Sequence, residues 1–288
     1  MGIQSQVSAA LHAHARTRLV ATLPAGGSFG ERALRNHALG QNTPEAGAWL
    51  TANPLDPRNK MTDGAFSEAM RKRLLLPDPR IKAGAACDVC AAPLDPLGTH
   101  AACCSGIDRS NRHKQFQEAV IKCVKEVSTL VTRAPTVESF YPKKAEAADV
   151  DTDNTRSQAD LGITLNNTSA GSVTLVDFVV VAAVKGQPAE YASAGAAANK
   201  AELDKVKKYG RYDIKPDFFF GFGVETTGAL GPAAKRLLWT AANAGGGNAT
   251  AVAWRYRRWI EHISVTVQAA LYYSHCRLLA LCVKPDEG

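Results

Sequence analysis

The sequence is poor in aromatic residues and has no long uninterrupted apolar run. Phe, Trp and Tyr make up 7% of its 288 residues, so we expect a core built mostly from Ala, Val and Leu. The longest apolar run, from Val173 to Val184, contains Asp177 and is far shorter than the roughly 20 residues that span a bilayer. Histidines and arginines interrupt the segment from Met1 to Leu19, which therefore does not match a secretory signal peptide. We expect an intracellular protein without a membrane partner.

Hydrophobic residues nevertheless make up 45% of the chain, which excludes a wholly disordered or fibrous protein. The chain carries 34 Lys and Arg against 27 Asp and Glu, a formal net charge of +7. This excess favours a polyanionic partner, either a nucleic acid or an anionic membrane face, but over a surface of this size it is only suggestive. The composition therefore indicates a folded protein and leaves its partner open.

The chain divides into four segments, which are residues 1–45, 46–82, 83–106 and 107–288. The first has weak periodicity and glycines that interrupt any long helix, so we expect a loosely ordered N-terminal arm. The second is predicted to be helical, with Phe66, Met70 and Leu74 on one face of a helix. The third holds a cluster of cysteines, and the fourth is predicted to form an α/β domain.

The fourth segment combines helical and strand patterns. Apolar residues at helical spacing predict a helix from Arg112 to Val131. Alternation predicts a strand from Leu161 to Leu165, and the β-branched run from Val173 to Val184 predicts a strand buried on both faces. Further elements are predicted at 191–209 (helix), 218–220 (strand), 231–242 (helix) and 254–281 (one or two helices). We therefore expect a mixed central sheet flanked by helices.

Seven cysteines are present, and four of them lie in one short stretch beside a histidine. An odd, clustered set is more typical of metal ligation in a reducing compartment than of a disulfide framework. Cys87, Cys90, His100 and Cys104 give the spacing C-x2-C-x9-H-x3-C, and thiolate and imidazole donors suit tetrahedral zinc. Cys103 is a competing fourth ligand. A set of incidental thiols in a loop is the alternative to a metal site.

Two aspartates are predicted to meet across the two strands. If the connecting turn centres near Thr168 and Ser169, antiparallel pairing places Asp160 opposite Asp177, with Cβ atoms about 5 Å apart. Like charges at that separation are destabilising unless they are compensated, and a divalent metal ion would compensate them. The alternative is that Asp177 pairs with a lysine or arginine, or faces solvent at the edge of its strand.

The helix predicted at 191–209 adds basic side chains to this pair. Small residues and Lys205 and Lys208 alternate there at spacings of four and three, so both lysines are predicted to emerge together and to reach the carboxylates. Two acids and a lysine are the minimal set for metal-assisted phosphodiester hydrolysis. The alternative is a solvated basic helix end that complements the helix dipole.

The order of these motifs resembles a known family. The knuckle C-x2-C…H-x3-C is followed by Asn111-Arg112-His113, then Arg156, then Ala159-Asp160, then Asp177-Phe178-Val179, then Lys205 to Tyr209. This order is similar to that of the restriction-like endonuclease at the C-terminus of non-LTR retrotransposon reverse transcriptase polyproteins, a member of the PD-(D/E)xK nuclease superfamily. The resemblance covers about residues 48–280, and the ordered set is more specific than any one motif.

The resemblance implies a PD-(D/E)xK nuclease-like core that nicks DNA. Asp160 and Asp177 would be ligands of Mg²⁺, or of Mn²⁺ in its place, and Lys205 or Lys208 would be the catalytic lysine. The sequence departs from the family pattern at Ala159, where a proline is usual. It departs again at Val179, the lysine position of a D-x-K motif, although a lysine moved to the following helix is familiar in the superfamily.

The resemblance also implies a zinc knuckle of the CCHC type, in which Cys104 rather than Cys103 is the fourth ligand. The chain is too short to hold the polymerase of such polyproteins as well. We therefore expect a solitary nuclease end, a domesticated derivative or a decayed fragment of such an element.

Four residues are predicted to contact nucleic acid, namely Arg112, His113, Arg156 and Arg257. At a helix start, His113 is equally interpreted as a cap or a surface residue. Arg257 lies among tryptophans and arginines that suit stacking and backbone contact with DNA, although an aromatic core stripe with a basic outer face explains the same residues. DNA is the expected partner, RNA is the alternative, and a nuclear location is expected if the organism is eukaryotic.

The sequence thus predicts a metal-dependent DNA endonuclease with Mg²⁺ and Zn²⁺ as cofactors. The alternative is a catalytically inactive nucleic-acid-binding remnant, in which the knuckle and the basic surface still work. The oligomeric state and the DNA target are not predicted by any of these patterns.

Overall fold

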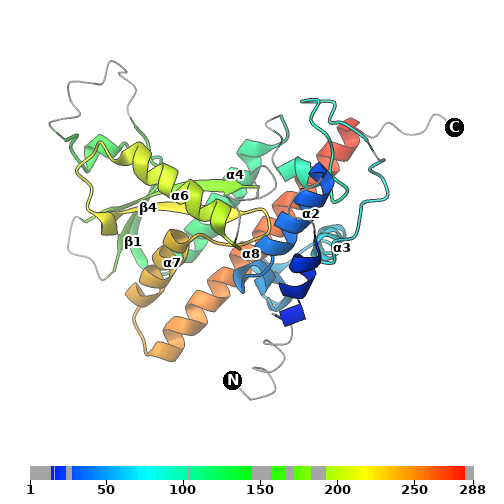
Figure 1. Cartoon of the computed structure of the whole chain (residues 1–288). Coiled ribbons are helices and arrows are strands. Elements are labelled where there is room, and N and C mark those ends of the chain that lie inside the picture. The colour runs from blue at the N-terminus through cyan, green and yellow to red at the C-terminus, as the bar shows by residue number, and fades with distance from the viewer. Residues whose placement is uncertain are drawn as a thin grey trace.

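The computed structural model shows a mixed α/β structure with a four-stranded mixed sheet flanked by helices (Figure 1). It describes residues 14–15, 17–23, 28–82, 84–102, 104, 106–144, 157–166, 172–182 and 193–282. Its helices include α2 (Phe29–Gly40), α3 (Asp63–Arg73), α4 (Arg109–Val124), α6 (Ala196–Tyr209), α7 (Pro232–Ala244) and α8 (Ala249–Cys282). The strands are β1 (Ser128–Arg133), β2 (Leu161–Leu165), β3 (Thr174–Val181) and β4 (Phe219–Glu225). Short 3₁₀ helices include η1 (Glu45–Leu50) and η3 (Thr99–Ala102).

The strands pair in the order β1-β2-β3-β4. The first two pairs are antiparallel, whereas β3 and β4 are parallel. Leu161 pairs with Val176, and one residue further along this register Asp160 faces Asp177, which is the predicted register. The continuous apolar sequence of β3 is explained by its place inside the sheet, between β2 and β4. The predicted centre of the connecting turn, at 168–169, lies outside the described residues.

Alternation along β3 and β4 places α4 and α6 on opposite faces of the sheet. Phe178 and Phe222 pack against Phe116 of α4, with ring centroids 5.7 and 5.5 Å from that of Phe116. On the other face α6 lies very close to β4, because a Cβ atom at Gly221 would be only 2.8 Å from a carbonyl oxygen of α6. Asp177 alternates with Phe178 along β3 and therefore points to the α6 side.

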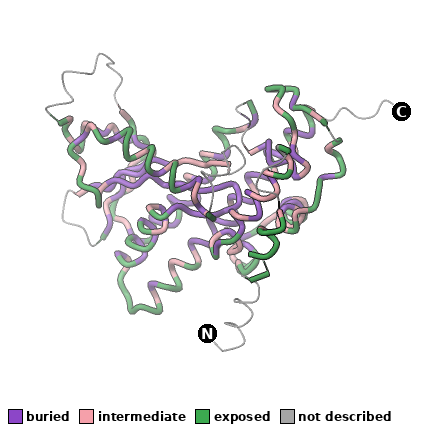
Figure 2. Tube along the Cα trace, viewed as in Figure 1, coloured by how far each residue is buried: buried purple, intermediate pink, exposed green. Residues whose placement is uncertain are grey.

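The core continues from α4 into α7 and α8. Trp259 of α8 is fully buried in the same cluster as Phe116 and the apolar residues of the strands. Figure 2 shows the buried residues concentrated along the strands and where the helices meet them. None of the helices in the described ranges is both long and apolar enough to cross a membrane.

The prediction that the helix runs to Val131 places its C-terminal end too late. α4 ends at Val124, and the strand β1 begins at Ser128. The valines of this stretch fit helical spacing, but β-branched residues also suit strands. Pairing of β1 with β2 adds ladder hydrogen bonds that a longer helix could not make. The predicted apolar face is correct up to Val124, because Phe116 and Val120 are buried as well.

The prediction of a loosely ordered N-terminal arm is wrong for residues 28–40, which form α2 and its N-cap. α2 begins with a capping box, in which the Ser28 N–H donates to Glu31 Oε2 at 2.8 Å and the Glu31 N–H donates to the Ser28 hydroxyl. Satisfying these end groups favours a helix despite Gly30 in its first turn. The C-terminal half of α2 is largely buried. Residues 1–13, 16 and 24–27 lie outside the described residues.

The helix predicted around Met70 exists as α3, but its buried face is not the predicted one. Phe66 and Leu74 are exposed, whereas Glu68 and Lys72 are buried. The reason is an ion pair, because Lys72 Nζ lies 3.0 Å from Glu68 Oε1 and each charge compensates the other. An apolar period alone could not identify this charged inner face.

Candidate functional site

The two predicted aspartates lie side by side, Asp160 at the start of β2 and Asp177 within the neighbouring strand β3. Asp160 directly precedes β2, and the backbone N–H of Phe178 in β3 donates to Asp160 Oδ2 at 2.7 Å. Asp177 is almost completely buried under α6. The strand register thus brings the two aspartates together, and the hydrogen bond from Phe178 ties the Asp160 carboxylate to the backbone of β3 next to Asp177.

Both predicted lysines reach the carboxylate of Asp177. Lys205 Nζ lies 2.7 Å from Oδ1, and Lys208 Nζ lies 3.3 Å from Oδ2. The spacing of three residues puts both lysines on the face of α6 that covers the sheet. The convergence predicted from the sequence is therefore present. The same contacts also agree with the alternative interpretation, in which Asp177 forms an ion pair with a basic side chain instead of binding a metal ion.

Tyr209 completes the surroundings of Asp177, and the sequence assigned it no role. Its hydroxyl oxygen lies 2.8 Å from Asp177 Oδ2 and 2.7 Å from the carbonyl oxygen of Gln158, and it accepts a hydrogen bond from Lys208. Burial and the charge of Asp177 raise the pKa of Tyr209, so the hydroxyl stays protonated and can donate. The only feature of the sequence that could have identified Tyr209 as part of this site is its position directly after Lys208.

His113 of α4 lies beside Asp160, on the other side of the carboxylate pair from α6. Its Nε2 is 3.3 Å from Asp160 Oδ2, and its ring packs edge-on against Phe178. Burial alone would raise the pKa of Asp160, but hydrogen bonds from neighbours that include His113 and the Phe178 N–H outweigh it and lower this pKa to about 2. His113 is thus part of the candidate site. Arg156, predicted to contact nucleic acid, lies outside the described residues.

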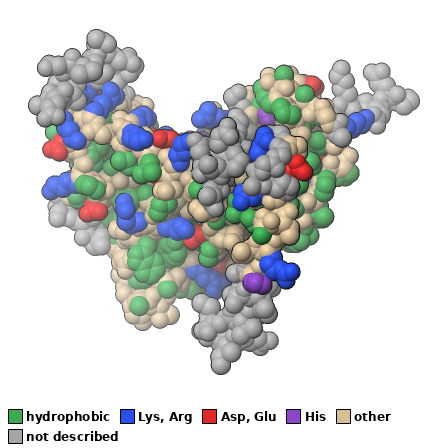
Figure 3. Space-filling view, in the orientation of Figure 1, with side chains coloured by type: hydrophobic (Ala, Val, Ile, Leu, Met, Phe, Trp, Pro, Cys, Tyr) green, Lys and Arg blue, Asp and Glu red, His purple; other side chains and the backbone are tan. Residues whose placement is uncertain are grey.

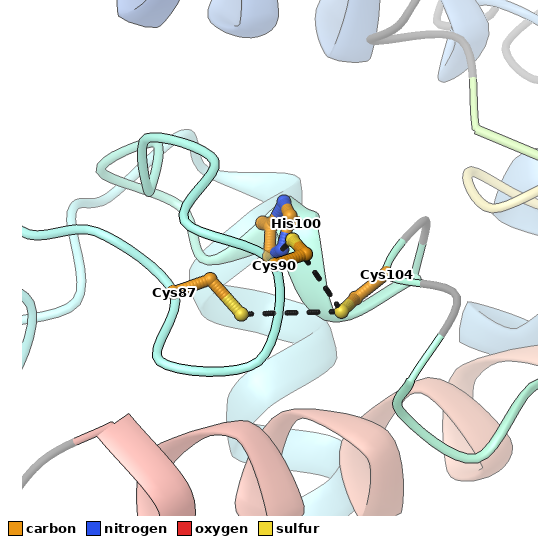
Figure 4. A group of neighbouring side chains, drawn as sticks. All are labelled: Cys87, Cys90, His100 and Cys104. Atoms are coloured by element: carbon orange, nitrogen blue, oxygen red, sulfur yellow. Dashed lines mark hydrogen bonds between the residues drawn. The ribbon is translucent and has the colours of Figure 1, made fainter.

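The four predicted metal ligands form a second site, next to the C-terminal part of α8. Figure 4 shows the side chains of Cys87, Cys90, His100 and Cys104 pointing toward one another. Their ligand atoms all lie within 4.8 Å of one another, so the group could hold a metal ion. Cys104 Sγ is 3.9 Å from Cys87 Sγ and 3.8 Å from Cys90 Sγ, and Cys90 Sγ is 3.3 Å from His100 Nε2. Two sulfurs on a tetrahedral zinc ion are about 3.8 Å apart, because Zn–S bonds are about 2.3 Å long.

Backbone N–H groups support two members of this cluster. Burial opposes ionisation of Cys87, but the N–H groups of Val89 and Cys90 point at its sulfur and lower its pKa. Asp95, which is fully buried, accepts hydrogen bonds from the backbone N–H groups of Thr99 and His100 and so fixes the turn that presents His100. Asp95 was not identified from the sequence. Cys103, the competing ligand, lies outside the described residues.

The cysteine segment is packed onto the rest of the molecule. Cys87 and Cys104 are buried in a cluster with Ile107 and with Leu278 of α8. The N–H of Asp88 also donates to the thiol of Cys282, in the last turn of α8. The segment is therefore joined to the C-terminal helix by apolar and polar contacts together.

Arg112 has a different position from the one that the resemblance implied. Its side chain is buried, and its guanidinium donates to the carbonyl oxygens of Ala101, Ala102 and Ile107 and to the Ser274 hydroxyl. These bonds link α4, the end of the cysteine segment and α8. A guanidinium so enclosed is not available to a nucleic acid, so the predicted DNA contact by Arg112 is corrected to a structural contact.

A third group of possible metal ligands consists of Glu68, Asp78 and His275, all buried. His275 Nε2 lies 2.6 Å from Asp78 Oδ2 and 3.6 Å from Glu68 Oε1. The group could hold a metal ion, but Arg71, Lys72 and Arg80 already pair with its carboxylates. This group was not identified from the sequence, because His275 lies far along the chain from Glu68 and Asp78.

Arg257 lies on the exposed side of α8. Its side chain is 69% exposed, and its Nε donates to Glu261 at 2.9 Å. Trp259 is buried in the core, as the aromatic-stripe interpretation requires, whereas Trp254 is exposed. The aromatic-stripe interpretation therefore holds for Trp259, and contact of this stretch with DNA stays a prediction. Figure 3 shows Lys and Arg side chains dispersed over the visible face rather than gathered in one patch.

Comparison with models of known protein families gives no match, and comparison with curated protein sequences gives none either. The chemistry of the described residues is therefore the basis for assigning a function.

Proposed function

We propose that the protein is a metal-dependent DNA endonuclease that nicks DNA by phosphodiester hydrolysis. The observation that carries the proposal is the meeting of Asp160, Asp177 and Lys205, with Lys205 Nζ 2.7 Å from Asp177 Oδ1. Mg²⁺ takes oxygen ligands and is commonly held by one or two carboxylates together with substrate phosphates. Two neighbouring carboxylates beside a partly exposed lysine suit that mode of binding.

The residues of the site have separate roles in this reaction. Asp160 and Asp177 would hold Mg²⁺ or Mn²⁺, which when bound neutralises phosphate charge and lowers the pKa of a coordinated water. Lys205 or Lys208 would stabilise the negative charge that develops on the phosphate. His113, which is one third exposed beside Asp160, would contact the phosphate backbone.

We infer zinc as the ion of the cysteine cluster. Three sulfur donors and one imidazole nitrogen are a common donor set of structural zinc sites, and the sulfur separations suit tetrahedral coordination. The buried position of Cys87 and Cys104 against α8 supports a structural role for this ion. The ion would hold the cysteine segment in place beside the nuclease core.

We further propose that this nuclease belongs to the PD-(D/E)xK superfamily and derives from a non-LTR retrotransposon reverse transcriptase polyprotein. The order of the sequence motifs supports the proposal, as does a mixed sheet with helices on both faces. Val179 stands where a D-x-K motif has its lysine, and Lys205 of α6 takes up the corresponding contact with Asp177. A lysine from the next helix therefore replaces the lysine of the strand.

A catalytically inactive nucleic-acid-binding remnant is the second candidate. The contacts of Asp177 favour it, because Lys205, Lys208 and Tyr209 together engage both oxygens of this carboxylate. Two ammonium groups already compensate the charge that a metal ion would compensate. In this case the aspartates and lysines are a structural ion-pair network.

Nicking of supercoiled plasmid tests the proposed function. The purified protein is incubated with plasmid in Mg²⁺, in Mn²⁺ and without divalent ions, next to the Asp177→Ala variant. We expect relaxed plasmid only with a divalent ion and only with the wild-type protein. Nicking that persists unchanged in Asp177→Ala would reject this site. Salt-sensitive DNA binding without nicking under any condition would support the inactive remnant.

A further inference from the structure

Two adjoining cavities form a groove along the N-terminal half of α8. One has a volume of about 640 Å³ and lies between α8 and η1, and the other, of about 370 Å³, lies between α8 and residues 51–59. Thr51, Arg257 and Glu261 line both cavities, so the two are continuous. We call this pair of cavities the α8 groove. Its total volume is in the range of sites that bind small ligands or parts of a polymer.

An aromatic side chain with one open face lies at one end of the α8 groove. Trp254 is 60% exposed, although a large apolar ring is usually buried. The guanidinium of Arg258 lies 4.6 Å from the centre of this ring, and Arg258 also forms an ion pair with Glu126. A tryptophan held on one face by a fixed arginine can stack another flat ring on its other face.

A guanidinium with free donors lies in the middle of the groove. Arg257 uses its Nε to bond Glu261, and its two terminal nitrogens have no partner among the residues that the structure describes. The bond to Glu261 limits the motion of the side chain and uses neither terminal nitrogen. Such a fork suits a phosphate oxygen pair.

The carboxylates around the groove do not exclude a phosphate. Asp56 is bound by Arg58 at 2.6 Å, Glu261 by Arg257, and Glu45 by Lys235 at 3.4 Å. Arg73 in the larger cavity adds a further positive charge. The acids are therefore compensated by their own partners, and the exposed donors of Arg257 remain for an anion.

We propose that the α8 groove binds single-stranded nucleic acid, with a base stacked on Trp254 and a phosphate held by Arg257. This inference deepens the proposed function and rests on it, because it supplies a binding path for a DNA strand outside the cleavage site. Glu126, which pairs with Arg258, lies just past the C-terminal end of α4, and His113 lies near its start. At a rise of about 1.5 Å per residue, α4 separates His113 from Glu126 by about 20 Å, a length of about six stacked nucleotides.

Fluorescence anisotropy of a labelled oligonucleotide tests the groove. A mixed-sequence single strand of twelve nucleotides is titrated with wild-type protein, Trp254→Ala and Arg257→Ala in magnesium-free buffer. We expect each variant to bind about tenfold more weakly than wild type, since loss of one stacked base or one phosphate contact has an effect of this order. The Arg257 variant is also expected to show a smaller dependence of affinity on salt.

Two matched variants serve as controls. Trp239→Ala removes another exposed tryptophan that lines neither cavity, and Arg277→Ala removes another exposed, ion-paired arginine of the same helix. Both are expected to bind like wild type. Wild-type affinity in Trp254→Ala and Arg257→Ala would overturn the inference, and so would an equal loss for duplex DNA in Trp254→Ala. If the protein binds single strands through this groove but does not nick plasmid, the endonuclease proposal is rejected and the proposal for the groove is supported.

Discussion

Replacing Cys87 by serine is expected to remove the bound zinc and to lower the melting temperature by at least about 10 °C. Structural zinc sites contribute about 10–16 kcal/mol of binding free energy, whereas whole domains are stable by only about 5–15 kcal/mol. Cys87 is fully buried, and its sulfur faces Cys104 at 3.9 Å. Loss of this ligand therefore frees the cysteine segment and also removes contacts with the C-terminal helix.

Zinc content and thermal unfolding measure this effect. Wild-type protein purified without chelator is expected to contain one zinc ion per chain, and a strong chelator is expected to reproduce the instability of Cys87→Ser. Cys276→Ser is the control, because this cysteine lies on α8 outside the cluster. A Cys87→Ser protein that keeps its zinc, or that melts with the wild type, would contradict the structural metal site.

Replacing Lys205 by methionine is expected to lower the rate of nicking about a hundredfold or more. Lys205 is 24% exposed and contacts Asp177 at 2.7 Å, so its ammonium group is fixed where phosphate charge would develop. Lys208 is 51% exposed and lies farther from the same carboxylate, at 3.3 Å. Lys208→Met is therefore expected to have the smaller effect.

The neighbouring lysine of α6 is a close control for both variants. Lys207 is 80% exposed, and its ion pair is with the exposed Asp204 and not with Asp177. Lys207→Met is therefore expected to nick at the wild-type rate. Single-turnover nicking with saturating enzyme separates the chemical step from binding of the plasmid. If Lys205→Met nicks as fast as Lys207→Met, the contact with Asp177 has no part in catalysis.

Local pattern and pairing rules predicted the central pair of strands. Antiparallel pairing needs only the position of a turn, so the register that joins Asp160 to Asp177 followed from the sequence and is confirmed by the pairing of Leu161 with Val176. The position of the two lysines followed from helical spacing in the same way. The register depends on two neighbouring strands, and the shared face of the lysines depends on a spacing of three residues within one helix.

The remaining features depend on packing between distant segments. The partners of Arg112 include Ser274, 162 positions further along the chain, so its burial could not be read from neighbouring residues. The pairing of His275 with Asp78 spans nearly two hundred positions. The end of α4 was misplaced because valines at helical spacing also suit a strand, and only the pairing with β2 distinguishes the two.

Calorimetric titration of Mn²⁺ into the purified protein tests the carboxylate pair most directly. We expect one Mn²⁺ site in the wild type and none in Asp160→Asn or Asp177→Asn, since each variant removes one of two charged oxygen ligands. Glu118→Gln is the control, because this carboxylate pairs with Arg133 on the surface. Absence of a Mn²⁺ site in the wild type, or an unchanged site in both asparagine variants, would contradict a metal-dependent nuclease built on Asp160 and Asp177.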